Sequence, residues 1–125
     1  MSTAPIRIGF SMSLTGGLAV NGQTAFLAQT IWKEEINRRG GLLGRQVELV
    51  CRDEETNASL VSGRYEHPLD VEKVDLATGG FGNKSLTPAM PLVIKRNRYF
   101  LGLMSWVGSL PSSLRVARAT KVALC

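Results

Sequence analysis

The chain has 125 residues, of which 44% are hydrophobic, and this size suits one globular core rather than two domains. Its net charge of +5 does not indicate nucleic-acid binding, because the last residues, 106–125, add Arg115, Arg118 and Lys121 without one acid and no nucleic-acid module is present. Two cysteines are too few for a metal site, no apolar window is long enough to span a membrane, and no secretory signal precedes the first strand.

The first fifty residues carry the pattern of a β-α-β unit. The apolar run Ile6–Met12 predicts a strand, and the glycine-bearing residues 14–17 predict a turn. Apolar residues then recur at spacings of three and four over residues 22–39, which predicts a helix with Asn21 or Thr24 as its N-cap. The glycines after that helix end it, and the alternating residues 45–50 predict a second strand.

A polar turn at residues 52–57 separates the second strand from a second helix. Asn57 or Ser59 can start this helix. We expect it to end at His67, because Pro68 lacks an N–H group and clashes with the preceding turn.

The next segments repeat the alternation of strand and helix. Residues 74–78 predict a third strand, followed by a glycine-rich loop at residues 79–84. A third helix fits residues 85–96, and the apolar residues 99–104 predict a fourth strand that is buried on both faces.

This order predicts an α/β fold, a doubly wound parallel sheet with helices on both faces. We expect residues 1–105 to form one ligand-binding lobe. Residues 106–125 form a basic tail in which 115–124 is either a short helix or a disordered segment.

Two glycine-bearing loops follow the first and third strands, at the edge where open α/β sheets bind ligands. Glycine lets a ligand approach the backbone, and Thr15, Asn83 and Ser85 offer neutral hydrogen-bond partners. The alternative is that these glycines only make tight turns and that Asn83 only caps a helix. Neither loop has the Gly-x-Gly-x-x-Gly spacing of a dinucleotide site, and no phosphate-binding loop is present.

The titratable residues offer no catalytic group. His67 is the only histidine and stands beside a proline at a helix end, so we expect it to be solvated. The adjacent Glu54 and Glu55 point in different directions, which predicts a solvated turn rather than a catalytic pair. Cys51 lies in an apolar strand pattern, where a buried small hydrophobe is the simpler interpretation.

Three segments together resemble the start of a known family. They are the strand at residues 6–10 with its Leu-Thr-Gly turn, the helix end at residues 37–45 (Asn-Arg-Arg-Gly-Gly-Leu-Leu-Gly-Arg), and the strand with its acidic turn at residues 47–57. The glycines of residues 79–82 and the Thr-Pro-Ala of residues 87–89 also fit in spacing. Residues 6–104 are similar to a type I periplasmic substrate-binding protein of the branched-chain amino acid group, which serves an ABC transporter.

The resemblance implies two α/β lobes that close on a small ligand and then meet a membrane permease. This chain would be the first lobe of a truncated member, not an enzyme, and would need no cofactor. The ligand would be an amino acid or a similar small carboxylate or amide. The implied cleft residues are Thr15, Asn21, Gly82, Asn83, Met104 and Ser105. The resemblance implies a periplasmic protein, whereas the chain as written, without a signal, would stay in the cytoplasm.

Two alternatives remain open on the sequence. One is a flavodoxin-like or nucleotide-binding enzyme domain, against which the absent phosphate motifs argue. The other is a fragment without binding activity, which self-associates through an exposed sheet edge.

Overall fold

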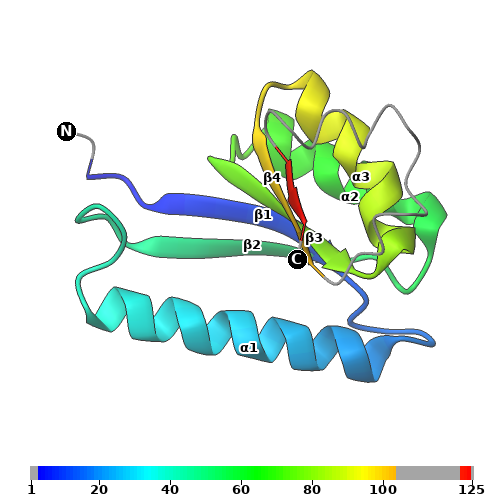
Figure 1. The fold of residues 1–125 in the computed structure, drawn as a ribbon, viewed down its shortest axis with the longest axis horizontal. Coiled ribbons are helices and arrows are strands. Elements are labelled where there is room, and N and C mark those ends of the chain that lie inside the picture. Colours follow the sequence, from blue (N-terminus) through cyan, green and yellow to red (C-terminus); the bar gives the residue numbers. More distant parts are fainter. Residues whose placement is uncertain (1–2, 104–121, 125) are drawn as a thin grey trace.

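The computed structural model describes residues 3–103 and 122–124, and it shows one parallel sheet with helices on both faces (Figure 1). The elements in chain order are β1 (Ile6–Met12), α1 (Ala19–Arg38), β2 (Val47–Asp53), α2 (Ala58–Asp70), β3 (Leu76–Phe81), α3 (Asn83–Lys95), β4 (Tyr99–Leu103) and β5 (Val122–Leu124). The predicted α/β alternation is therefore confirmed. None of the helices in these described ranges is long and apolar enough to cross a membrane.

The strand order is β2-β1-β3-β4-β5, and every neighbouring pair is parallel. The chain thus starts in the interior of the sheet, adds β2 on one side and then grows in the other direction. In Figure 1, α1 runs along one face, and α2 and α3 lie side by side on the other. The carboxyl ends of β1, β2 and β3 consequently meet at one edge of the sheet.

The two faces of the sheet have separate cores. On the α1 face, the rings of Phe10 and Phe26 pack with centroids 6.1 Å apart. On the other face, Tyr65 of α2 packs against Phe100 of β4 at 6.4 Å, and both side chains are buried. Burial of such large apolar side chains contributes about 1.5–3 kcal/mol each.

Helix α1 begins earlier than predicted. Its N-cap is Leu18, which makes no side-chain capping bond, so the predicted caps Asn21 and Thr24 both lie inside the helix. The Thr24 hydroxyl instead donates to the Val20 carbonyl at 2.7 Å, as threonines in helix interiors often do. The helix end was predicted well, since Gly40 adopts φ = 104°, a conformation that suits glycine.

Helix α2 continues past the predicted stop at His67 and ends at Asp70, with Pro68 inside it. A proline inside a helix removes one backbone hydrogen bond, and its ring clashes with a carbonyl of the preceding turn. Here Pro68 lies in the last turn, where few bonds remain to be lost, and its ring is buried in the core. The Val71 N–H still closes the helix by donating to the His67 carbonyl at 2.9 Å.

Strand β3 includes the glycines that the sequence placed in a loop. Gly79 and Gly80 lie within β3, and a Cβ at Gly79 would stand 2.1 Å from Cδ2 of Leu86. At Gly80 a Cβ would stand 2.7 Å from the Ser11 carbonyl oxygen. These two glycines therefore serve the close packing of β3 against α3 and β1, not the approach of a ligand.

Strand β4 is not buried on both faces as predicted. Tyr99 is 65% exposed and Leu101 is 42% exposed, whereas Phe100 between them is buried. The exposed residues lie on the α1 face, where α1 covers β1 and β2 but not β4. Beyond β4, residues 122–124 of the predicted tail form β5 rather than a helix, and most of that tail lies outside the described residues.

Candidate functional site

The candidate site lies at the carboxyl edge of the sheet, where the loops after β1, β2 and β3 converge. A small cavity between them is lined by Ser13, Leu18, Glu54, Thr56, Ala58, Lys84 and Ser85. These residues come from the loops after β1 and β2 and from the first turns of α2 and α3. The topology thus brings together residues as far apart in the sequence as Ser13 and Ser85.

Asp53, the last residue of β2, organises the loop after β1. Its Oδ1 accepts the N–H groups of Leu14 at 3.0 Å and Thr15 at 3.3 Å, and its Oδ2 accepts the Thr15 hydroxyl at 2.7 Å. Partial burial by itself would raise the pKa of Asp53. The hydrogen bonds from the Glu55 N–H, Thr15 and Leu14 outweigh it and hold the pKa below its usual value.

Thr56, in the loop after β2, also forms hydrogen bonds to the loop after β1. Its hydroxyl donates to the Thr15 carbonyl at 2.7 Å and accepts the Leu18 N–H at 3.1 Å. Because the Thr15 hydroxyl donates its hydrogen bond to Asp53, the Thr15 oxygen can act only as an acceptor toward a ligand.

Glu54 is the residue that the sequence analysis misjudged. It is 1% exposed, and its carboxylate accepts the hydroxyl groups of Ser11, Ser13 and Ser85, with a distance of 2.9 Å from Ser13. One buried side chain thereby ties together the ends of β1 and β2 and the first turn of α3. Its neighbour Glu55 is exposed, as predicted.

A signal for this cluster was present in the sequence. Three serines stand at the ends of apolar elements, where a lone small hydroxyl needs a partner once it is buried. What the sequence did not show was that all three face one carboxylate, because Ser11 lies in β1, Ser13 in the loop after it and Ser85 far along the chain in α3.

Helix α3 begins at this edge, two residues earlier than predicted. Its N-cap is Gly82, whose φ of 81° favours glycine, and no side chain caps the helix. Asn83 is the first helical residue and is half-buried, with exposed Lys84 next to it. No acidic residue occupies the first turn, so the positive end of the helix dipole and a lysine face the same edge.

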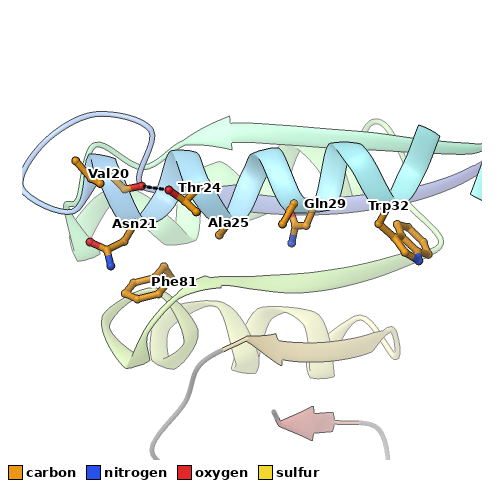
Figure 2. A pocket seen from close by; sticks show the side chains of 8 residues that line it. Val20, Asn21, Thr24, Ala25, Gln29, Trp32 and Phe81 are labelled. Atoms are coloured by element: carbon orange, nitrogen blue, oxygen red, sulfur yellow. Dashed lines mark hydrogen bonds between the residues drawn. The ribbon is translucent and has the colours of Figure 1, made fainter. Parts of the chain in front are cut away.

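A larger groove of about 510 Å³ lies between α1 and the end of β3 (Figure 2). It is lined by Val20, Asn21, Thr24, Ala25, Ala28, Gln29, Trp32 and Phe81. In Figure 2 the Phe81 ring points from β3 toward α1 beside Asn21, and Gln29 and Trp32 follow along the helix.

The predicted site residues therefore fall into three groups. Thr15, Gly82 and Asn83 lie on the loops at the carboxyl edge. Asn21 lies in the first turn of α1 and lines the groove instead of belonging to the loop after β1. Met104 and Ser105 lie outside the described residues.

The other titratable residues that the sequence singled out are His67 and Cys51. His67 is exposed, and its Nδ1 lies 3.1 Å from Oε1 of Glu72 on the surface. Burial, with the charge of Asp53 next, raises the pKa of the Cys51 thiol to about 12, so this thiol is protonated at neutral pH. Among residues 3–103 and 122–124, no group of three or more His, Cys, Asp or Glu side chains could hold a metal ion.

Comparison with known proteins decides the family. The sequence profile described as periplasmic binding protein matches residues 5–119, which is most of the chain. The chain belongs to the periplasmic binding protein family. Among solved structures, this family member is similar to the branched-chain amino acid transporter substrate-binding protein LivJ from Streptococcus pneumoniae, in complex with isoleucine. The TM-score is 0.84 at 20% identity, covering 96% of this chain and 33% of that one.

Two further structures support the same fold. A solute-binding protein of an ABC transporter from Rhodopseudomonas palustris, in complex with 3,4-dihydroxybenzoic acid, has a TM-score of 0.78 at 16% identity and covers 98% of this chain and 32% of that one. The leucine-binding protein LivK from Thermotoga maritima has a TM-score of 0.71 at 20% identity, and the match covers 80% of this chain and 28% of that one. A search of curated protein sequences found no match.

At these identities the similarity establishes the fold alone. This periplasmic binding protein spans about a third of the length of the structures that it matches. The predicted membership of the periplasmic binding protein family is therefore confirmed, and the solved structures share its fold.

Proposed function

We propose that this chain is the first, ligand-recognising lobe of a solute-binding component of an ABC-type uptake system. It recognises an amino acid or a similar small carboxylate or amide and has no enzymatic activity. The observation that carries the proposal is the uncapped N-terminus of α3 at the carboxyl edge, beside Asn83 and Lys84 and opposite the loop after β1. Family membership supports the same conclusion.

The α3 end suits a carboxylate. Helix N-termini favour anions through their first N–H groups and the dipole, and an amide side chain can donate to the same anion. The ligands named for two similar structures, isoleucine and 3,4-dihydroxybenzoic acid, both carry a carboxylate. We therefore assign the ligand carboxylate to Gly82 and Asn83.

The loop after β1 suits the opposite end of an amino acid. The Thr15 oxygen is an acceptor because its proton points to Asp53, whose low pKa keeps it ionised near neutral pH. A ligand ammonium or amide N–H can donate to such an oxygen close to a negative charge. The site is thus polarised, with an acceptor at Thr15 and an anion site at α3.

The other expectations from the sequence remain part of this proposal. Met104 and Ser105 would complete the cleft after β4, and Asn21 would contribute from the start of α1. The ligand-bound protein would meet an ABC permease and work in the periplasm. Residues 1–105 would form the body of the lobe and residues 106–125 a basic tail, of which residues 122–124 add β5 to the sheet.

Affinity should be weak, because one lobe buries only part of a ligand and leaves its polar anchors open to water. NMR titration of the 125-residue chain with leucine is a suitable measurement, since it detects millimolar binding. We expect a Kd weaker than micromolar, and a micromolar or tighter constant for any free amino acid would contradict the one-lobe proposal. No shift of the edge residues at any concentration would mean that the chain is a fragment without binding activity.

Two variants test the assignment of the ligand ends. Loss of one hydrogen bond to a charged group costs about 1.5–3 kcal/mol, so Asn83→Ala should weaken the binding of leucine at least tenfold. His67→Ala, on the far surface, should leave the affinity for leucine unchanged. Thr15→Val should weaken the binding of leucine but not that of 4-methylpentanoate, which lacks the ammonium group. Equal losses for both compounds would remove Thr15 from the ammonium end, and equal curves for the Asn83 and His67 variants would remove Asn83 from the site.

A further inference from the structure

The turn between β2 and α2 has an unfavourable backbone conformation. The Glu54 carbonyl accepts the Asn57 N–H at 2.8 Å, which closes a β-turn. The two central residues of this turn, Glu55 and Thr56, have φ angles of 55° and 56°. Positive φ at both central positions defines a mirror-image turn, which glycine, asparagine and aspartate normally occupy. Thr56 is also β-branched, and no other β-branched residue in the described part of the chain has a positive φ.

This turn interlocks with the loop after β1. The Thr56 hydroxyl donates to the Thr15 carbonyl at 2.7 Å and accepts the N–H of Leu18, the N-cap residue of α1, at 3.1 Å. Gly16 packs directly on the turn, since a Cβ there would stand 2.6 Å from the Glu55 carbonyl oxygen and 2.8 Å from Oγ1 of Thr56. A strained backbone persists only where such surroundings fix it, and here the contacts that fix it come from the loop after β1.

Thr56 and Asp53 together fix every polar group of Thr15. Asp53 accepts its N–H and its hydroxyl, and Thr56 binds its carbonyl. A glycine at position 56 would suit the positive φ but would have no hydroxyl to offer. A threonine there therefore exchanges a relaxed turn for a loop held in one conformation. A loop that is already ordered loses less entropy when a ligand binds.

We propose that Thr56 is a positioning residue for the ligand site, which it serves by holding Thr15 in place as an acceptor. This inference rests on the proposed function, in which the Thr15 oxygen binds the ammonium or amide end of the ligand. Thr56 itself makes no contact with the ligand in this arrangement. Its effect should therefore be confined to ligands that use Thr15.

Two variants of Thr56 separate positioning from mere stability. Valine matches threonine in size but lacks the hydroxyl, whereas serine keeps the hydroxyl and loses the branch. In the folded 125-residue chain, Thr56→Val should raise the exchange rate of the Leu18 amide about tenfold. It should weaken the binding of leucine by about threefold to tenfold and leave that of 4-methylpentanoate unchanged. Thr56→Ser should match the unmodified chain in all three measurements, by NMR titration and hydrogen exchange, and circular dichroism checks that both variants are folded.

Glu55 provides the control for backbone strain. It has the same positive φ, but its side chain forms an exposed ion pair with Arg64 at 3.3 Å. Glu55→Gly should therefore relax the turn and raise the midpoint of urea unfolding, while the affinity for leucine stays the same. If relaxing the turn at Glu55 weakened leucine as much as Thr56→Val does, the effect would belong to the turn and not to the Thr56 hydroxyl, and the proposal would be wrong.

A second pair of variants tests the same contact from the loop after β1, with Thr56 intact. Gly16→Ala forces a Cβ into the Glu55 carbonyl and Oγ1 of Thr56, so it should reproduce the effects of Thr56→Val on exchange and on leucine. Gly17→Ala is the matched control, because nothing lies within 4 Å of its Cβ position. This pair keeps the test decisive even if Thr56→Val does not fold.

The outcomes separate this inference from the proposed function. Unchanged exchange of Leu18 in Thr56→Val and Gly16→Ala would overturn the inference, and so would equal losses of affinity for leucine and 4-methylpentanoate. Faster exchange without any loss of leucine affinity would also overturn it. If the unmodified chain binds neither compound while exchange responds as expected, the proposed function is refuted, and the positioning of the loop by Thr56 is supported.

Discussion

Gly22 offers a sharp test of how α1 is held against the sheet. A Cβ at this position would stand 2.0 Å from the Ser13 carbonyl oxygen and 2.6 Å from its carbonyl carbon. Both contacts are to backbone at the end of β1, so no side-chain rotation can relieve them. Replacing a helical glycine by alanine normally stabilises a helix by about 1 kcal/mol, but overpacking costs about 1–3 kcal/mol and more where backbone must move.

We therefore expect Gly22→Ala to lower the free energy of unfolding by about 2 kcal/mol, with loss of the contact between α1 and the loop after β1. Gly63→Ala in α2 is the control, because nothing lies within 4 Å of its Cβ position. That variant should be more stable by about 0.5–1 kcal/mol. Urea unfolding followed by circular dichroism, at one protein concentration, measures both. If Gly22→Ala is stabilised as much as Gly63→Ala, the close packing of α1 on β1 is wrong.

Three other predictions follow from the carboxyl edge and its neighbour. Glu54→Ala should lower the free energy of unfolding by about 3 kcal/mol or more, because it removes the carboxylate that accepts three buried hydroxyl groups. In the same urea titration, the control Glu55→Ala should change that free energy by less than about 0.5 kcal/mol. Because the pKa of Asp53 is lowered in the folded state, its contribution to the free energy of unfolding is present above about pH 4 and is lost as the pH falls through the folded-state pKa. The free energy of unfolding should therefore fall less steeply with acid in Asp53→Asn than in the unmodified chain. An unchanged slope would show that the hydrogen bonds of Asp53 do not stabilise the fold. Partial burial, with the charge of Asp53 next, raises the pKa of the Cys51 thiol to about 12, so alkylation at pH 8 in a Cys125→Ser chain should be much slower than that of free cysteine. Comparable rates would show that its surroundings do not disfavour the thiolate.

Much of the architecture could be predicted from the sequence because its signals are local. The apolar run of β1 and the glycines that end α1 depend on residues close together in the chain, and they were located to within a few residues. Alternation of strands and helices also predicted the parallel sheet, because parallel strands need crossover connections. The helix N-terminus at Asn83 and the loop at Thr15 were placed at the correct edge for the same reason.

What the sequence could not determine depends on contacts between distant segments. Glu54 looked like a solvated turn residue until the fold placed three serines around it, and Gly79 looked like a loop glycine until α3 packed against β3. Pro68 could remain in α2 because burial of its ring offsets a lost hydrogen bond. Asp53, a residue 38 positions away, determines that the Thr15 hydroxyl donates within the protein and leaves its oxygen as an acceptor. Local periodicity determines which elements form, whereas the partner of each buried polar group, and the exposure of each face, are decided only when the elements pack.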